Sequence, residues 1–159
     1  MPNPNLIDIQ DTLLAVIRGS PTLGSYCRSI EVYEGGLTPE QLALSAQLYR
    51  YPACLLNYQG STPSTQANKS ITLTETHALL LLDQNRQGIQ QALRGDAQAV
   101  NVGTYQMVVD ARALLIGNRL GRTDLAPLTY GGDVALLATE IFSAYQALFL
   151  TWYVYRIGV

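Results

Sequence analysis

The stretch that decides the fold is "AYQALFLTWYVYRI", Ala144–Ile157, which is the most apolar part of the chain and carries a single charge, Arg156. The apolar run from Ile141 to Ile157 has 17 residues, the lower limit for a helix that crosses a bilayer, and a serine, a glutamine and a threonine interrupt it. Its many aromatic and β-branched residues are typical of strands. We therefore predict a strand here and no membrane span.

Alternation along this strand places apolar or aromatic side chains on both of its faces. One face carries Leu148, Leu150, Trp152 and Val154, and the other carries Tyr145, Phe149, Tyr153 and Tyr155. A domain of this size has too few elements to cover both faces of such a strand. We therefore expect Trp152 to be buried in the core, and we expect a neighbouring subunit to cover Tyr153 and Tyr155.

Three amphipathic helices are predicted from apolar residues that recur at spacings of three and four. The first begins at Asn3, a candidate N-cap, and ends at Gly19. The second begins at Thr38, which can form a capping box with the glutamine three residues later. The third carries the clearest apolar stripe, from Met107 on, and we expect Gly121 to cap its C-terminus.

Strands are expected between and after these helices. Ser29–Glu34 and "ACLLNY", Ala53–Tyr58, each predict a short strand. The segment "QGSTPSTQANKS", Gln59–Ser70, predicts an exposed loop because it is rich in turn residues. The alternation in Ser70–Asp83 then predicts one long strand, or two strands that meet at a bulge near His77.

These elements together predict one domain, residues 1–159, of the α+β class: a mostly antiparallel sheet with helices packed on one face. The chain has a formal net charge of −2, and Lys69 is its only lysine. No basic patch is therefore available to neutralise a run of phosphates, and nucleic-acid recognition is not expected. A hydrophobic fraction of 48% with 14% charged residues points instead to apolar contacts with protein partners.

Candidate catalytic and metal-binding residues are few. His77 is the only histidine, and Glu75 lies two residues away. No nucleophile lies at a sequence spacing that would indicate a catalytic pair with His77. Cys27 and Cys54 form no CxxC pair, and with one histidine they are too few for a closed zinc site. We expect a partly exposed His77, two ordinary buried thiols, no catalytic, cofactor-binding or metal-binding residue, and no enzymatic activity.

A small α+β enzyme or ligand-binding domain is the alternative from a different functional class. A pocket with convergent polar groups and a perturbed titratable residue would favour it. Exposed charges in predicted loops or at a helix end are candidates for contacts between subunits or with partners. These are Arg94, Asp96, Arg119, Arg122 and Asp124.

Several segments, taken in order, resemble a known family. They are "YPACLLNYQG" (51–60), "LRGD" (93–96), "YQMVVDARALLIGNRLG" (105–121), "DLAPL" (124–128) and "SAYQALFLTWY" (143–153). Within them, "LLIGNRL" and "DLAPL" are similar to a helix and its following loop in an uncharacterised-domain family encoded beside the tail sheath gene of Mu-like contractile-tailed phages. Members of that family are taken to be tail terminators.

The resemblance implies a structural virion protein without a cofactor. Tail terminators form a homo-oligomeric ring, usually a hexamer, that caps the head-proximal end of the tail, stops tube growth and joins the tail to the neck. The implied partners are further copies of the chain, the tail tube and sheath proteins, and the neck or connector protein, while DNA passes through the ring without sequence recognition. The implied location is the virion tail, after assembly in the bacterial host cytoplasm, and no membrane is involved. A head completion or neck protein is the closest alternative.

Overall fold

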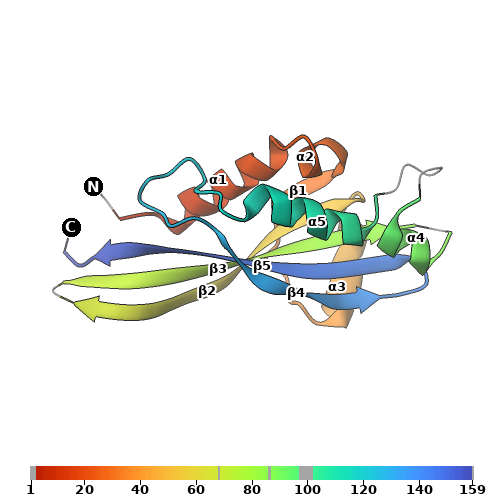
Figure 1. The fold of residues 1–159 in the computed structure, drawn as a ribbon. Coiled ribbons are helices and arrows are strands. Elements are labelled where there is room, and N and C mark those ends of the chain that lie inside the picture. The colour runs from red at the N-terminus through yellow and green to blue at the C-terminus, as the bar shows by residue number, and fades with distance from the viewer. Residues whose placement is uncertain (1–2, 68, 86, 97–101, 159) are drawn as a thin grey trace.

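The computed structural model describes residues 3–67, 69–85, 87–96 and 102–158, which form a five-stranded sheet flanked by helices (Figure 1). The strand order is β1-β2-β3-β5-β4, in which only β1 and β2 run parallel. The strands are β1 (Ser29–Val32), β2 (Ala53–Ala67), β3 (Ser70–Gln84), β4 (Thr129–Ala138) and β5 (Phe142–Arg156). The helices are α1 (Leu6–Arg18), α2 (Leu23–Tyr26), α3 (Pro39–Ser45), the 3-10 turn η1 (Ala46–Leu48), α4 (Ile89–Arg94) and α5 (Thr104–Leu115). The α+β prediction and the strand predicted from Ala144 on are confirmed.

Two hydrophobic clusters lie on opposite faces of the sheet. In the larger cluster, α1 and α5 pack on β3 and β5 through Ile9, Leu13, Ile17, Met107, Ala111, Leu115, Leu79, Leu81 and Phe149. On the other face, Leu42 of α3 packs with Leu80 and Phe142. Figure 1 shows α3 below one end of the sheet, and no other helix within the described ranges lies over the rest of this second face. Helices therefore occupy both faces, but unequally, so the predicted placement of helices on one face was wrong for α3.

Side-chain caps fix the starts of α1 and α3. The capping box at Thr38 is formed as predicted, with the backbone N–H of Gln41 donating to the Thr38 side chain over 3.3 Å. The cap of α1 is Asn5, whose side chain accepts from the N–H of Ile7 over 3.0 Å, so the prediction of Asn3 as the cap was wrong by two residues. The Asn3 side chain instead hydrogen-bonds the backbone of Arg156, at the C-terminal end of β5.

The predicted loop at Gln59–Ser70 was wrong, because β2 continues to Ala67. This segment pairs with β3 as a long hairpin, and register shifts between Tyr58 and Gly60 and beyond Pro63 absorb its irregularities. The polar composition of this segment is typical of a loop. It is polar because this part of the hairpin extends beyond the helices, where neither face of the strand has to be apolar. β3 itself is continuous through His77, without the bulge considered for that position.

The chain after α5 folds back along the sheet. α5 ends at Leu115, so Gly121 is not its cap, although it has a positive φ of 67° that favours glycine. The N–H of Gly117 donates to the carbonyl of Leu128, and the N–H of Leu128 donates to the carbonyl of Asn118, each over 2.8 Å. These bonds close the loop and position it beside the C-terminal half of β5.

The molecule is extended rather than round. Its accessible surface is 8549 Å², compared with about 7,900 Å² expected from the size scaling of compact monomers at this mass. Figure 1 shows the cause: β2, β3 and β5 run past the helices at the end where both termini lie. Among the helices of the described chain, none has the length and apolar character needed to cross a bilayer.

Candidate assembly surface

The C-terminal end of β5, Trp152–Arg156, exposes its apolar side chains, and we refer to it as the uncovered end of β5. Trp152 is 51% exposed and Val154 is 47% exposed, whereas Leu148 and Leu150 on the same face are half-buried. The cause is the short α3 layer, which reaches only the Phe142 end of this face. The prediction that Trp152 is buried was therefore wrong: this face, rather than the opposite one, is open to a partner.

Tyr153 lies on the covered face and is a core residue. It is 5% exposed, and its hydroxyl donates over 2.9 Å to buried Glu75, which also accepts from the Tyr58 hydroxyl over 2.6 Å. Burial, together with this bond to Glu75, raises the pKa of Tyr153. The prediction of Tyr153 as a contact residue was wrong, while Tyr155, at 39% exposure, remains available at the end of the strand.

A groove runs along the outer edge of β5 beyond the end of β4. β4 pairs with β5 only as far as Leu150. Beyond that point the N–H of Ala126 donates to the carbonyl of Trp152 over 2.9 Å, and Asn3 exchanges two 2.8 Å bonds with the backbone of Arg156. The groove between these two attachments has a volume of about 320 Å³.

Val154 lies at the middle of this groove. In an antiparallel strand, alternate residues point both backbone groups to the same side. The carbonyl of Trp152 and the backbone of Arg156 bond away from β3, so the N–H and C=O of Val154 point the same way, into the groove. An extended segment of another chain could hydrogen-bond there, as in strand addition to a sheet edge.

The predicted contact charges fall into two groups at opposite ends of the sheet. Arg119 is exposed and lines the groove together with Asp124. Arg122 donates two bonds to Asp124, over 3.0 and 2.7 Å, and these hydrogen bonds lower the pKa of the Asp124 carboxyl. Exposed Arg94 and half-buried Asp96 lie at or beside α4, at the other end in Figure 1. The structure thus brings Arg119, Arg122 and Asp124 together and separates them from Arg94 and Asp96.

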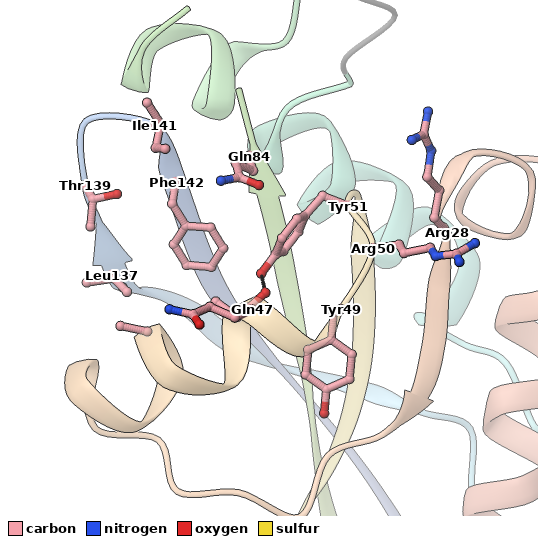
Figure 2. Close-up of a pocket in the computed structure, with 12 residues that line it drawn as sticks. Arg28, Gln47, Tyr49, Arg50, Tyr51, Gln84, Leu137, Thr139, Ile141 and Phe142 are labelled. Carbon is pink, nitrogen blue, oxygen red and sulfur yellow. Dashed lines mark hydrogen bonds between the residues drawn. The ribbon is translucent and has the colours of Figure 1, made fainter. Parts of the chain in front are cut away.

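A second hollow, of about 590 Å³, lies between the α3–η1 segment and the turn that joins β4 to β5 (Figure 2). Two arginines, Arg28 and Arg50, lie on one side, while Leu137, Ile141 and Phe142 lie on the other. None of these five residues was predicted as a site residue, because they come from three parts of the sequence that are distant from one another, at residues 28, 50 and 137–142.

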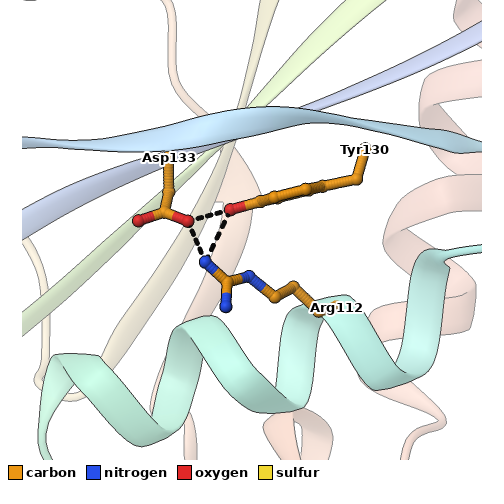
Figure 3. A network of polar contacts seen from close by, with 3 residues as sticks. All are labelled: Arg112, Tyr130 and Asp133. Carbon is orange, nitrogen blue, oxygen red and sulfur yellow. Dashed lines mark hydrogen bonds and ion pairs between the residues drawn. The ribbon is translucent and has the colours of Figure 1, made fainter.

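Arg112, Tyr130 and Asp133 form a polar network that joins α5 to β4 (Figure 3). The guanidinium of Arg112 donates to the Tyr130 hydroxyl over 2.9 Å, lies 4.9 Å from the centre of its ring, and pairs with the Asp133 carboxylate, which also accepts from Tyr130. Sequence reasoning missed this network, and no spacing signal marks it, since its members lie on a helix and on a strand beyond the following loop.

Of the titratable residues considered for chemistry, His77 and Cys54 are buried. His77 is fully buried, so the expectation of partial exposure was wrong, and burial lowers its pKa to about 4, with a smaller opposing effect from Glu75. Cys54 is buried but Cys27 is half-buried, so the expectation of two buried thiols is confirmed only for Cys54. Burial raises the pKa of both thiols, that of Cys27 to about 12. Within the described ranges, no group of three or more His, Cys, Asp or Glu side chains is arranged to hold a metal ion.

Apolar strand surface that extends beyond a domain's own helices is typical of a protein that associates with other proteins. The comparison with protein families identifies the class. A family model described as "Bacteriophage Mu, Gp37" matches residues 5–154, and the chain belongs to this family. It is therefore a phage structural or morphogenesis protein, associated with the virion. A search of curated proteins gave no match.

Proposed function

We propose that the chain is a tail terminator, which forms a ring at the head-proximal end of the phage tail, stops growth of the tail tube and joins the tail to the neck. The observation that carries the proposal is the uncovered end of β5. There Trp152 and Val154 expose apolar surface beside a groove into which the backbone of Val154 points. Membership of a phage Mu family supports it further.

A ring requires a heterologous contact, in which one surface of a subunit meets a different surface of the next and the rotation closes. The uncovered end of β5 supplies one such surface. The edge strand β4, which lies on the opposite side of the groove from Asn3, supplies the second. Interfaces of standard size bury about 800 Å² on each partner. The excess surface of this extended chain is suited to a contact of that size.

The ring would have two faces with different partners. One face meets the last ring of the tail tube and the sheath, and the other meets the neck or connector protein. The face that meets the neck does not repeat the surface on which tube subunits add. No further tube ring can therefore bind there, and polymerisation ends. DNA passes through the ring without sequence recognition, in keeping with a net charge of −2 and a single lysine. The protein acts as a structural part and not as an enzyme.

Tail length in phage lysates tests this proposal. Without a terminator the tube has no stop, so a phage that lacks this gene should produce tails of uncontrolled length, and purified protein added during assembly should restore a uniform length. A head completion or neck protein gives a different result: tails of normal length that fail to join heads. Normal tail length in the absence of the gene would exclude the terminator role.

A further inference from the structure

The pocket shown in Figure 2 has a charge that differs from the rest of the molecule. The chain has 12 Asp and Glu residues against 10 Lys and Arg, yet the pocket lining contains two arginines and no acidic residue. Neither Arg28 nor Arg50 belongs to an ion pair among the residues that the structure describes. The lining itself therefore offers an anionic group two guanidinium groups and no carboxylate.

Backbone contacts hold the two arginines on neighbouring segments. The N–H of Arg28 donates to the carbonyl of Pro52 over 2.8 Å, and the N–H of Arg50 donates to the hydroxyl of Ser29 over 2.9 Å. Both residues precede strands of the sheet, β1 and β2, that pair with each other. The positions from which the two side chains extend are thus fixed relative to each other.

The rest of the pocket is apolar and aromatic. Tyr51 and Phe142 pack edge to face with ring centres 5.5 Å apart, and the Tyr51 hydroxyl donates to the carbonyl of Ala46 in η1. Burial raises the pKa of Tyr51 to about 12, so this donor keeps its proton at neutral pH. Leu137 and Ile141 extend the apolar wall beside Phe142. A simple anion such as phosphate would leave this wall uncovered.

We propose that this pocket binds an acidic peptide segment of a partner protein, with a carboxylate on Arg28 and Arg50 and a neighbouring apolar or aromatic side chain against Tyr51 and Phe142. The volume of about 590 Å³ is within the range of pockets that bind ligands of a few side chains. The pocket and the groove beside Trp152 lie at opposite ends of β5, so each can serve a different contact. The inference rests on the proposed function only in that the partner would be a tail or neck protein.

Peptide binding to the full chain tests the site. The probe is fluorescein-labelled Glu-Phe-Asp-Leu, blocked at its terminus, and binding is followed by fluorescence anisotropy. The matched probes are Gln-Phe-Asn-Leu, which removes the charge, and Glu-Gly-Asp-Gly, which removes the apolar side chains. We expect each matched probe to bind at least tenfold more weakly than the first.

Two sets of substitutions locate the binding. Arg28→Glu with Arg50→Glu should weaken the acidic probe at least tenfold. Lys69→Glu with Thr62→Glu and Gln66→Glu makes the same change in net charge at exposed positions outside the pocket and should leave binding unchanged. Equal binding of the uncharged probe, equal loss in both variants, or no binding at millimolar concentration would overturn the proposal.

Sedimentation of the same samples separates this inference from the ring. If Arg28→Glu with Arg50→Glu dissociates the assembly, the pocket's occupant is a second copy of the chain, and the proposed partner peptide is wrong. Binding of the acidic probe to a protein that stays monomeric would refute the ring and leave the peptide site standing. Assembly of a protein that does not bind the probe would refute the peptide site and leave the ring standing.

Discussion

Trp152→Ala distinguishes the role of the uncovered face from a role in the core. Trp152 is 51% exposed, so about half of its side chain packs against its own domain. Burial of about 120 Å², half of a tryptophan's roughly 250 Å², contributes at most about 3 kcal/mol at 25 cal/mol per Å², and about 2 kcal/mol after allowance for a compact unfolded chain. We expect the variant to fold, with its free energy of unfolding lowered by about 2 kcal/mol. This is less than the 3–5 kcal/mol typical of a fully buried aromatic side chain.

The exposed half of Trp152 is available to a neighbouring subunit. If that half is covered on assembly, its loss should weaken each subunit contact by about 2 kcal/mol, or about 30-fold in the dissociation constant. Sedimentation velocity over a concentration series measures this shift. The emission of Trp152, the only tryptophan, should also move to shorter wavelength as the wild type assembles.

Tyr105→Ala is the matched control. Tyr105 is 44% exposed and packs on Tyr145 with ring centres 5.6 Å apart, but it lies on α5, on the other side of the sheet from Trp152. We expect a similar loss of stability and no change in association. Assembly of Trp152→Ala that is as tight as in the wild type, or an equal loss in Tyr105→Ala, would refute the reasoning.

Three other substitutions test the interior and the loop. Tyr153→Phe removes a bond to a buried carboxylate and should cost about 1.5–3 kcal/mol by chemical denaturation, whereas exposed Tyr155→Phe should change stability by less than about 0.5 kcal/mol; equal effects would contradict this. The pKa of His77 is lowered from 6.5 to about 4, so between these pH values the unfolded chain binds a proton that the folded chain does not. Roughly 3 kcal/mol of stability that is present above pH 6.5 is therefore lost as the pH falls towards 4. His77→Leu should flatten this dependence of stability on pH, and an unchanged profile would count against the prediction. Charge reversal at Arg119 together with Arg122 should weaken assembly, and an oligomer of unchanged size would rule out that contact.

Elements with a local signal were predictable from the sequence. The capping box at Thr38 and the apolar stripe from Met107 on both depend on residues within one or two helical turns, so short windows contain the information. The aromatic and β-branched content of Ala144–Ile157 likewise identified a strand. Family membership agrees with the resemblance drawn from its segments.

Features that depend on distant partners were not predictable. Alternation separated Trp152 from Tyr153 but could not say which face the helices cover, because this depends on the short reach of α3 and on the bond from Tyr153 to Glu75. The β2–β3 hairpin was missed because its strand partner, rather than apolar alternation, defines it. The pocket beside Arg28 and the network around Arg112 combine segments that no local pattern connects.

Electron microscopy of the purified protein tests the central claim most directly, with the wild type and Trp152→Asp compared at the same concentrations. An aspartate at this half-exposed position loses the packing of the buried half of Trp152, as alanine does, but leaves the rest of the core in place. It also places a charge in the proposed contact, where burial without a partner is costly. We expect closed rings from the wild type and single subunits from the variant. Wild-type protein that stays monomeric at high concentration, or rings that form equally well with Trp152→Asp, would contradict assembly through the uncovered end of β5.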